Sequence, residues 1–375
     1  MDARVEQPAA ATRERLMSLD ALRGFDMFWI VGGYWIVRGL ANGLRNPWFN
    51  QYILPQTDHV RWEGFVAWDL IMPLFLFVVG AAMPFSFAKR LERDPGKARL
   101  YGHIIYRVAI LWILGMIAQG RLLDYDLSKL QLYSNTLQAI AAGYLIASLI
   151  LLNLQLQWQV LATGGLLLGY WALLTLVPVP GHGAGQLTEQ GNLAIYIDTL
   201  ILGPFQDGTN PPYTWILSSM TFAATVMIGA FAGQLLRLDR SKAEKVLVLL
   251  ISGAACVLAG WAWGHIFPII KHIWTSSMVL YAGGWSLLLL GLFYLVIDVL
   301  EFRFLTSFFV VIGMNAIAAY MATHVFDFRN LGDIFVRGLA RWTGDWQDFV
   351  RAAAGITILW LILYYLYRKK TFVKI

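Results

Sequence analysis

Charged residues are scarce in this chain of 375 residues. Asp, Glu, Lys and Arg together make up 14% of the sequence, whereas 58% of it is hydrophobic. A soluble globular domain carries about 25% charged residues, which it needs to cover its surface. The shortage argues against an ordinary soluble enzyme and predicts that lipid covers much of the molecule.

Cysteine is nearly absent as well. The single one, Cys256, lies in an apolar run, so neither an intramolecular disulfide nor a thiolate metal site can form. The six histidines show no metal-binding spacing such as HxxxH on a helix, and we predict no metal. The sequence also has no GxSxG, no Walker loop and no Rossmann fingerprint, so none of those activities is predicted.

The sequence is instead rich in apolar runs of about twenty residues, the length of a transmembrane helix. Only helices and closed barrels satisfy the backbone in hydrocarbon, and these runs are too long for barrel strands. We predict an all-α, polytopic integral membrane helix bundle with about ten transmembrane helices. The predicted spans are 18–38, 64–87, 101–120, 132–152, 157–177, 214–236, 244–264, 276–298, 304–326 and 347–367.

Basic residues indicate how this bundle is oriented. An even number of spans places both termini on one side, and the main basic clusters fall there, at residues 13–15, 89–99, 237–245 and 368–374. The positive-inside rule makes that side cytoplasmic. The net charge of +6 then reflects topology and contact with anionic lipid, and no nucleic-acid partner is expected. Residues 1–15 are polar and are predicted to form a disordered cytoplasmic tail.

Three long loops lie on the opposite, far face of the predicted bundle, at about 39–63, 178–213 and 327–346. Long loops without secondary structure are often functional, and we expect these loops to cap a site that opens to the exterior. An apolar stretch near 192–203 is too short to span the membrane and is predicted to be interfacial or re-entrant.

A carboxylate and a histidine stand out at the start of the second span. Asp69 lies in its first turns, and His59 precedes it by ten residues in the far-face loop. A buried carboxylate needs a partner, and a carboxylate bound to an imidazole can fix its tautomer and raise its basicity. The two residues are a candidate general-base pair; the alternative is an ordinary solvated histidine.

The first span carries three ionisable residues, Asp20, Arg23 and Asp26, in or beside its cytoplasmic half. Asp20 and Arg23 are three residues apart and can pair on one helical face. Arg23 is therefore either half of a structural ion pair or an anchor for a phosphorylated cofactor.

Other polar residues lie in or beside the predicted spans, and each has a structural explanation as well as a functional one. Arg107 lies near the cytoplasmic end of the third span, where the structural explanation is that its side chain snorkels to the interface. Asn315 and His324 are nine residues apart and share approximately one helical face, which fits either interhelical hydrogen bonds or a site. Lys271 precedes the eighth span and can be a polar cap at the interface.

Several stretches together resemble a family of membrane acetyltransferases, the heparan-α-glucosaminide N-acetyltransferases. The run at 18–26, SLDALRGFD, resembles the opening of that family, and residues 59–73 look like its histidine loop and following helix. Weaker similarities follow in the same order at 136–138, 271–277 and 313–324.

The resemblance implies a single transmembrane acetyltransferase domain over 16–375, which transfers the acetyl group of cytoplasmic acetyl-CoA to a terminal glucosamine or related amino sugar. His59 and Asp69 would be catalytic; we favour His59 as general base in a ternary complex, with a covalent acetyl-imidazole as the alternative. The expected acetyl-CoA contacts are Arg23, Arg107, Gln138 and Asn315. The expected acceptor contacts are Trp62, Glu63, Lys271, Ser277 and His324.

The sequence departs from the family pattern at 30–35 and at Glu63, where the family has asparagine, so we expect its contacts to the acceptor to differ from those of the family. We expect a bacterial inner membrane protein with both termini cytoplasmic, in contact with membrane lipid, and with a homodimer as the candidate oligomer. Two other functions stay open. An O-acyltransferase would form an ester instead of an amide, and a sugar or lipid transporter would keep its transport when His59 is replaced by alanine.

Overall fold

The structure is a computed structural model that describes residues 16–94, 96–304 and 306–373. Within these ranges the chain is helical, with two isolated β-bridges and no strand. The predicted tail at 1–15 lies outside the described residues. The helices are α1 (Met17–Phe28), α2 (Tyr34–Leu44), α3 (Pro47–Tyr52), α4 (Ile71–Arg93), α5 (Lys97–Ala118), α6 (Thr136–Asn153), α7 (Leu156–Leu176), α8 (Leu193–Leu202), α9 (Ser219–Arg237), α10 (Lys242–Gly264), α11 (Ser276–Tyr294), α12 (Thr306–Met314), α13 (Ala316–Val325), α14 (Phe328–Trp342) and α15 (Gln347–Arg368).

Eight helices of the described ranges are long and apolar enough to cross a membrane, and α12 with α13, bent by 72°, makes up to nine. This confirms the all-α, polytopic membrane protein. The first predicted span is not among the eight, because α1 and α2 are joined by a π-helical turn, Trp29–Gly33. Gly32 adopts φ +146° in that turn, a conformation that glycine reaches without the steric cost of a Cβ.

The far-face loops hold more structure than predicted. The stretch 39–63 contains α3, and the apolar stretch near 192–203 is the short helix α8. The stretch 327–346 is largely the amphipathic helix α14. Its exposed apolar residues, Ile334, Phe335 and Leu339, recur at helical spacing. Because charged residues stand between them, we predicted a loop here.

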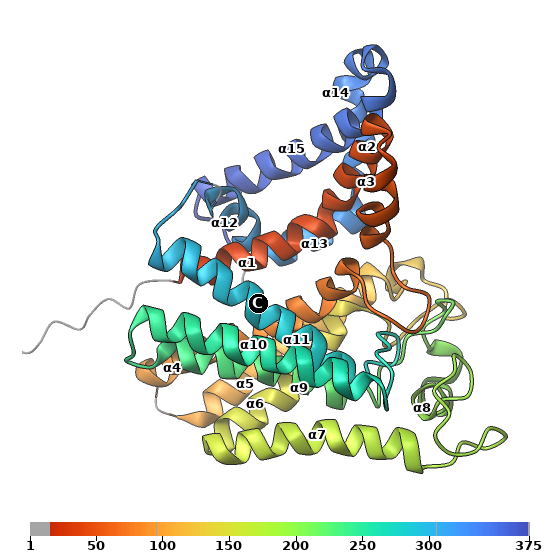
Figure 1. Ribbon diagram of the computed structural model, residues 1–375, viewed down its shortest axis with the longest axis vertical. Coiled ribbons are helices and arrows are strands. Elements are labelled where there is room, and N and C mark those ends of the chain that lie inside the picture. The colour runs from red at the N-terminus through yellow and green to blue at the C-terminus, as the bar shows by residue number, and fades with distance from the viewer. Residues whose placement is uncertain (1–15, 95, 305, 374–375) are drawn as a thin grey trace, which may run out of the picture.

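Two faces of the bundle can be distinguished from its hydrogen bonds. Asp298 at the end of the α11 segment accepts from the Ser18 backbone N–H at 3.2 Å and from Lys242 Nζ, through its carbonyl oxygen, at 2.6 Å. The starts of α1 and α10 therefore lie on one face, which we call the near face. The long loops and α8 gather at the opposite, far face, on the right of Figure 1.

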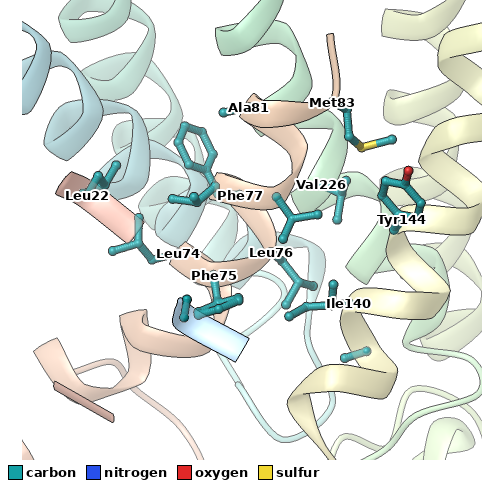
Figure 2. Packing of buried hydrophobic residues seen from close by; sticks show 14 of the residues in the cluster. Leu22, Leu74, Phe75, Leu76, Phe77, Ala81, Met83, Ile140, Tyr144 and Val226 are labelled. Atoms are coloured by element: carbon teal, nitrogen blue, oxygen red, sulfur yellow. The ribbon is translucent and has the colours of Figure 1, made fainter. Parts of the chain in front are cut away.

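Helix α4 runs through the centre of the core. Its side chain Leu74 lies next to Leu22 of α1 on one side, while Leu76 lies toward α6 and α9 (Figure 2). Helix α9 packs directly on its backbone: a Cβ added to Gly80 would lie 1.9 Å from the carbonyl oxygen of Val226. Small residues let membrane helices approach this closely. Asp69 lies just before α4, in the 3₁₀ turn Ala67–Leu70.

Candidate active site

His59 and Asp69 meet at the far-face start of α4. His59 Nδ1 lies 2.7 Å from Asp69 Oδ1, and the second carboxylate oxygen accepts from the Val66 backbone N–H at 3.2 Å. Asp69 is 1% exposed and the His59 side chain 41% exposed. A carboxylate only accepts hydrogen bonds, so Nδ1 of neutral His59 carries the proton. Nε2 then keeps a free lone pair that can take a proton from a substrate.

Lys271, from a distant part of the chain, lies beside the pair of His59 and Asp69. Its Nζ lies 3.5 Å from Asp69 Oδ1 and 3.2 Å from His59 Nδ1, and its side chain is 4% exposed. Burial lowers the pKa of Lys271 to about 8, against the opposing attraction of Asp69. The structure thus places Lys271, which we predicted to contact the acceptor, beside the catalytic candidates.

The surroundings keep the His59 imidazole neutral near pH 7. Burial is the largest influence and lowers its pKa from 6.5; the hydrogen bond to Asp69 raises the pKa, and the Lys271 charge lowers it again. A neutral imidazole is the form that acts as a general base or a nucleophile.

The loop that carries His59 is held by the segment that carries Lys271. The Gly64 N–H donates to the Ile269 carbonyl at 2.9 Å, and Glu63 forms an antiparallel bridge with Ile270. Trp62 donates through Nε1 to the Leu187 carbonyl at 2.8 Å. These contacts explain how residues 212 positions apart meet, and they give Trp62 and Glu63 a positioning role.

His272, next to Lys271, belongs to this support. Its ring stacks between Trp62, at a centroid distance of 5.4 Å, and Tyr213, at 4.2 Å. Burial and the nearby Lys271 charge lower its pKa to about 4, so it is a neutral packing residue at pH 7.

His59 and Lys271 line a cavity of about 1070 Å³, whose wall also includes residues of α13, α14 and α15. Pockets for drug-sized ligands range from about 300 to 1,000 Å³, so this cavity can hold a sugar together with the reactive end of a thioester. His324, with Nδ1 2.9 Å from the Tyr320 carbonyl, lines it from α13. Its aromatic lining residues include Trp35, Trp68, Tyr213, Trp215 and Phe326.

Four of the other predicted site residues do not line this cavity. Arg107 lies over the Tyr144 ring at 4.5 Å, and Gln138 accepts from the Ser134 N–H at 2.9 Å. Asn315 accepts from the Val373 N–H, and Ser277 donates to the Pro268 carbonyl.

Arg23 also lies away from the cavity and pairs with Asp20 at 3.5 Å, as its spacing predicted. The cavity therefore places only His59, Lys271 and His324 of the predicted residues on its wall, with Asp69 directly behind His59. The cofactor and acceptor roles of the others stay predictions.

No protein-family model matches the chain. Among curated proteins it is similar to heparan-alpha-glucosaminide N-acetyltransferase of Homo sapiens, with 25% identity over an alignment of 438 residues that covers 98% of this chain. The Mus musculus enzyme of the same name is 25% identical over 375 residues, or 84% of the chain. This chain is a distant relative of these enzymes. It spans 62% and 56% of the length of these N-acetyltransferases.

Sequence reasoning missed some residues of the cavity. Asp207 is nearly buried on its wall and accepts from the Thr209 N–H at 3.1 Å, and burial raises its pKa. Asn135 also lines the cavity and caps α6, accepting from the Leu137 N–H at 2.9 Å. The N-cap position of Asn135 could have been read from the sequence, but neither residue lies in a pattern that indicates a site.

Proposed function

We propose that the protein is a transmembrane acetyltransferase, which moves the acetyl group of acetyl-CoA to the amine of a terminal glucosamine or a related amino sugar at the far face. The near face, where arginines end α4, α9 and α15, would be cytoplasmic, in a bacterial inner membrane. The observation that carries the proposal is the cavity-facing His59, held by buried Asp69 and Lys271. The distant N-acetyltransferase relatives support it.

The chemistry follows from the free Nε2 of His59. It takes a proton from the acceptor amine, whose nitrogen attacks the thioester carbonyl; a C–N bond forms, the C–S bond breaks, and the thiolate receives the proton back from the imidazolium. Asp69 stabilises the imidazolium, as in a triad. Lys271 balances the Asp69 charge while the imidazole is neutral. Because a thioester is reactive, positioning and proton removal suffice.

The cavity offers chemistry that suits a sugar acceptor. Trp35, Trp68 and Tyr213 provide aromatic faces, and Asp207 and Asp327 provide carboxylate groups. Sites for small polar ligands combine apolar and aromatic walls with a few placed polar groups. We therefore assign the outer part of the cavity to the acceptor and the part beside His59 to the acetyl group.

The test is acetyl transfer by the purified protein. With acetyl-CoA and glucosamine, the wild type should form N-acetylglucosamine, and His59→Ala should lower kcat by at least about a hundredfold, because proton transfer contributes about 10²–10⁴. His182→Ala is the matched control, since His182 is exposed on the far face and does not line the cavity. Full turnover by His59→Ala would remove His59 from the mechanism, and an ester product would indicate an O-acyltransferase.

A further inference from the structure

A second carboxyl group is buried in the helices below the cavity. Asp26 of α1 is 0% exposed, and neither of its carboxylate oxygens has a hydrogen-bond partner in the part of the chain that the structure describes. Burying a polar group without a hydrogen-bond partner is costly, and ionisable residues within membrane helices usually mark a substrate, ion or proton path. The mechanism above does not use Asp26, so the burial of its carboxyl group without a partner needs another explanation.

The position of Asp26 along α1 suggests that reason. Residues three or four apart share a helical face, so Arg23 and Asp26 follow one another along one side of α1, and Ile30 follows in the π-helical turn Trp29–Gly33. Arg23 lies toward the near face, where α1 begins, and Ile30 lines the cavity. Along the chain, Asp26 therefore lies between the near face and the cavity wall, on the side from which the proposed donor would approach His59.

Apart from Arg23, the residues of α1 around Asp26 are apolar. Leu22, one turn away, is fully buried and faces Leu74 of α4 (Figure 2), and the cavity lining includes Val31 and Met72. The reactive arm of acetyl-CoA, its pantetheine part, is an uncharged chain of methylene groups interrupted by amides. An apolar path with one hydrogen-bond acceptor matches such a chain.

We propose that Asp26 binds the pantetheine arm of acetyl-CoA between α1 and α4, where its carboxyl group accepts a hydrogen bond from an amide N–H of the arm. This inference rests on the proposed function and names the residue by which the donor is recognised within the membrane. A buried carboxyl group without a partner gains a hydrogen bond when the arm binds. A ligand without the amide would leave the carboxyl group unpaired and bind more weakly.

The ligand-free protein should not lose stability when Asp26 is replaced. Asp26→Leu removes an unpartnered buried carboxyl group and fills its volume with methyl groups, a change that is often neutral or stabilising. Its thermal midpoint should equal or exceed that of the wild type, and Asp26→Asn should lie close to the wild type. If Asp26 served only to hold the fold, both variants would melt at lower temperature.

The decisive experiment measures binding without turnover. CoA and adenosine bisphosphate, its nucleotide part, are titrated against the purified full-length protein without acceptor. Asp26→Leu should raise the Kd for CoA tenfold or more, Asp26→Asn, which keeps an acceptor oxygen, should raise it by less, and both should leave the Kd for adenosine bisphosphate unchanged. Ser286→Ala is the control, because Ser286 is a fully buried polar residue of α11 that donates to the Ala282 carbonyl at 2.8 Å, in its own helix.

The outcomes separate the two proposals. Equal CoA affinity in the wild type and both Asp26 variants would overturn the role of Asp26 and leave the proposed function standing. A parallel loss of affinity for adenosine bisphosphate would also overturn it, since Asp26 would then act on the nucleotide. If the wild type bound no CoA, both proposals would fall.

Discussion

At the residue scale, the account depends on a charge-balanced group of three side chains. Asp69 and Lys271 are nearly buried, and His59 connects them to the cavity. Burying any one of these groups without a partner would be costly, but together they supply hydrogen-bond and charge partners to one another. The sequence could predict the pair of His59 and Asp69, because a carboxylate at the start of an apolar span needs a partner nearby. It could not predict Lys271 as the third member, because that contact depends on how two loops pack.

Asp69→Asn should lower kcat strongly with a small change in KM. The amide can donate to Nδ1 of His59, which would move the imidazole proton to Nε2 and remove the free lone pair from the cavity. Loss of the corresponding aspartate in a triad costs about 10⁴ in kcat, and we expect a loss of about 10²–10⁴ here. Steady-state kinetics of the purified variant measure it; a kcat within a factor of about three of the wild type would show that Asp69 does not orient His59.

The pH profile of kcat/KM should have an acid limb set by His59. Its pKa lies below the ordinary value of 6.5, so activity is lost as pH falls through that lower value and the imidazole becomes protonated. Lys271→Met removes a charge that lowers the pKa of His59. The acid limb of the variant should therefore move to higher pH.

The alkaline limb of the same pH profile gives a second measurement of the role of Lys271. In the wild type Lys271 loses its charge near its pKa of about 8, so a change of rate is expected there that is absent in Lys271→Met. An acid limb that stays in place in Lys271→Met, measured over the same buffers, would contradict the electrostatic role of Lys271.

At the element scale, the membrane helices could be predicted from apolar runs, while their interruptions could not. The predicted first and ninth spans are both broken, at Gly32 and between α12 and α13, and both broken segments contribute residues to the cavity wall. Hydropathy averages over such breaks. The breaks at Gly32 and at Asn315, which precedes α13, can be located only once the backbone path is known.

The contact of α4 with α9 should be sensitive to a single methyl group. Gly80→Ala places a Cβ against the Val226 carbonyl, and overpacking of this kind costs about 1–3 kcal/mol. Gly102→Ala is the control, because its Cβ meets nothing within 4 Å and alanine favours helix by up to about 1 kcal/mol. Thermal unfolding in detergent should show a lower midpoint for Gly80→Ala alone; equal midpoints would contradict the close packing.

At the scale of the whole molecule, two groups of helices enclose the cavity. Figure 1 shows α1, α12, α13 and α15 on one side and α4 to α11 on the other, with α2, α3 and α14 at one end. The cavity wall draws on both groups. Composition and charge could predict the membrane bundle and its basic face, but not this division, because it depends on contacts between residues far apart in sequence.

The central claim is that an acyl thioester from the near side meets His59 in this cavity. A map of the protein with bound CoA tests it most directly. The account predicts the thiol in the cavity, within reach of His59 Nε2, with the arm passing along α1. Density for CoA on another surface, with its thiol outside this cavity, would contradict it.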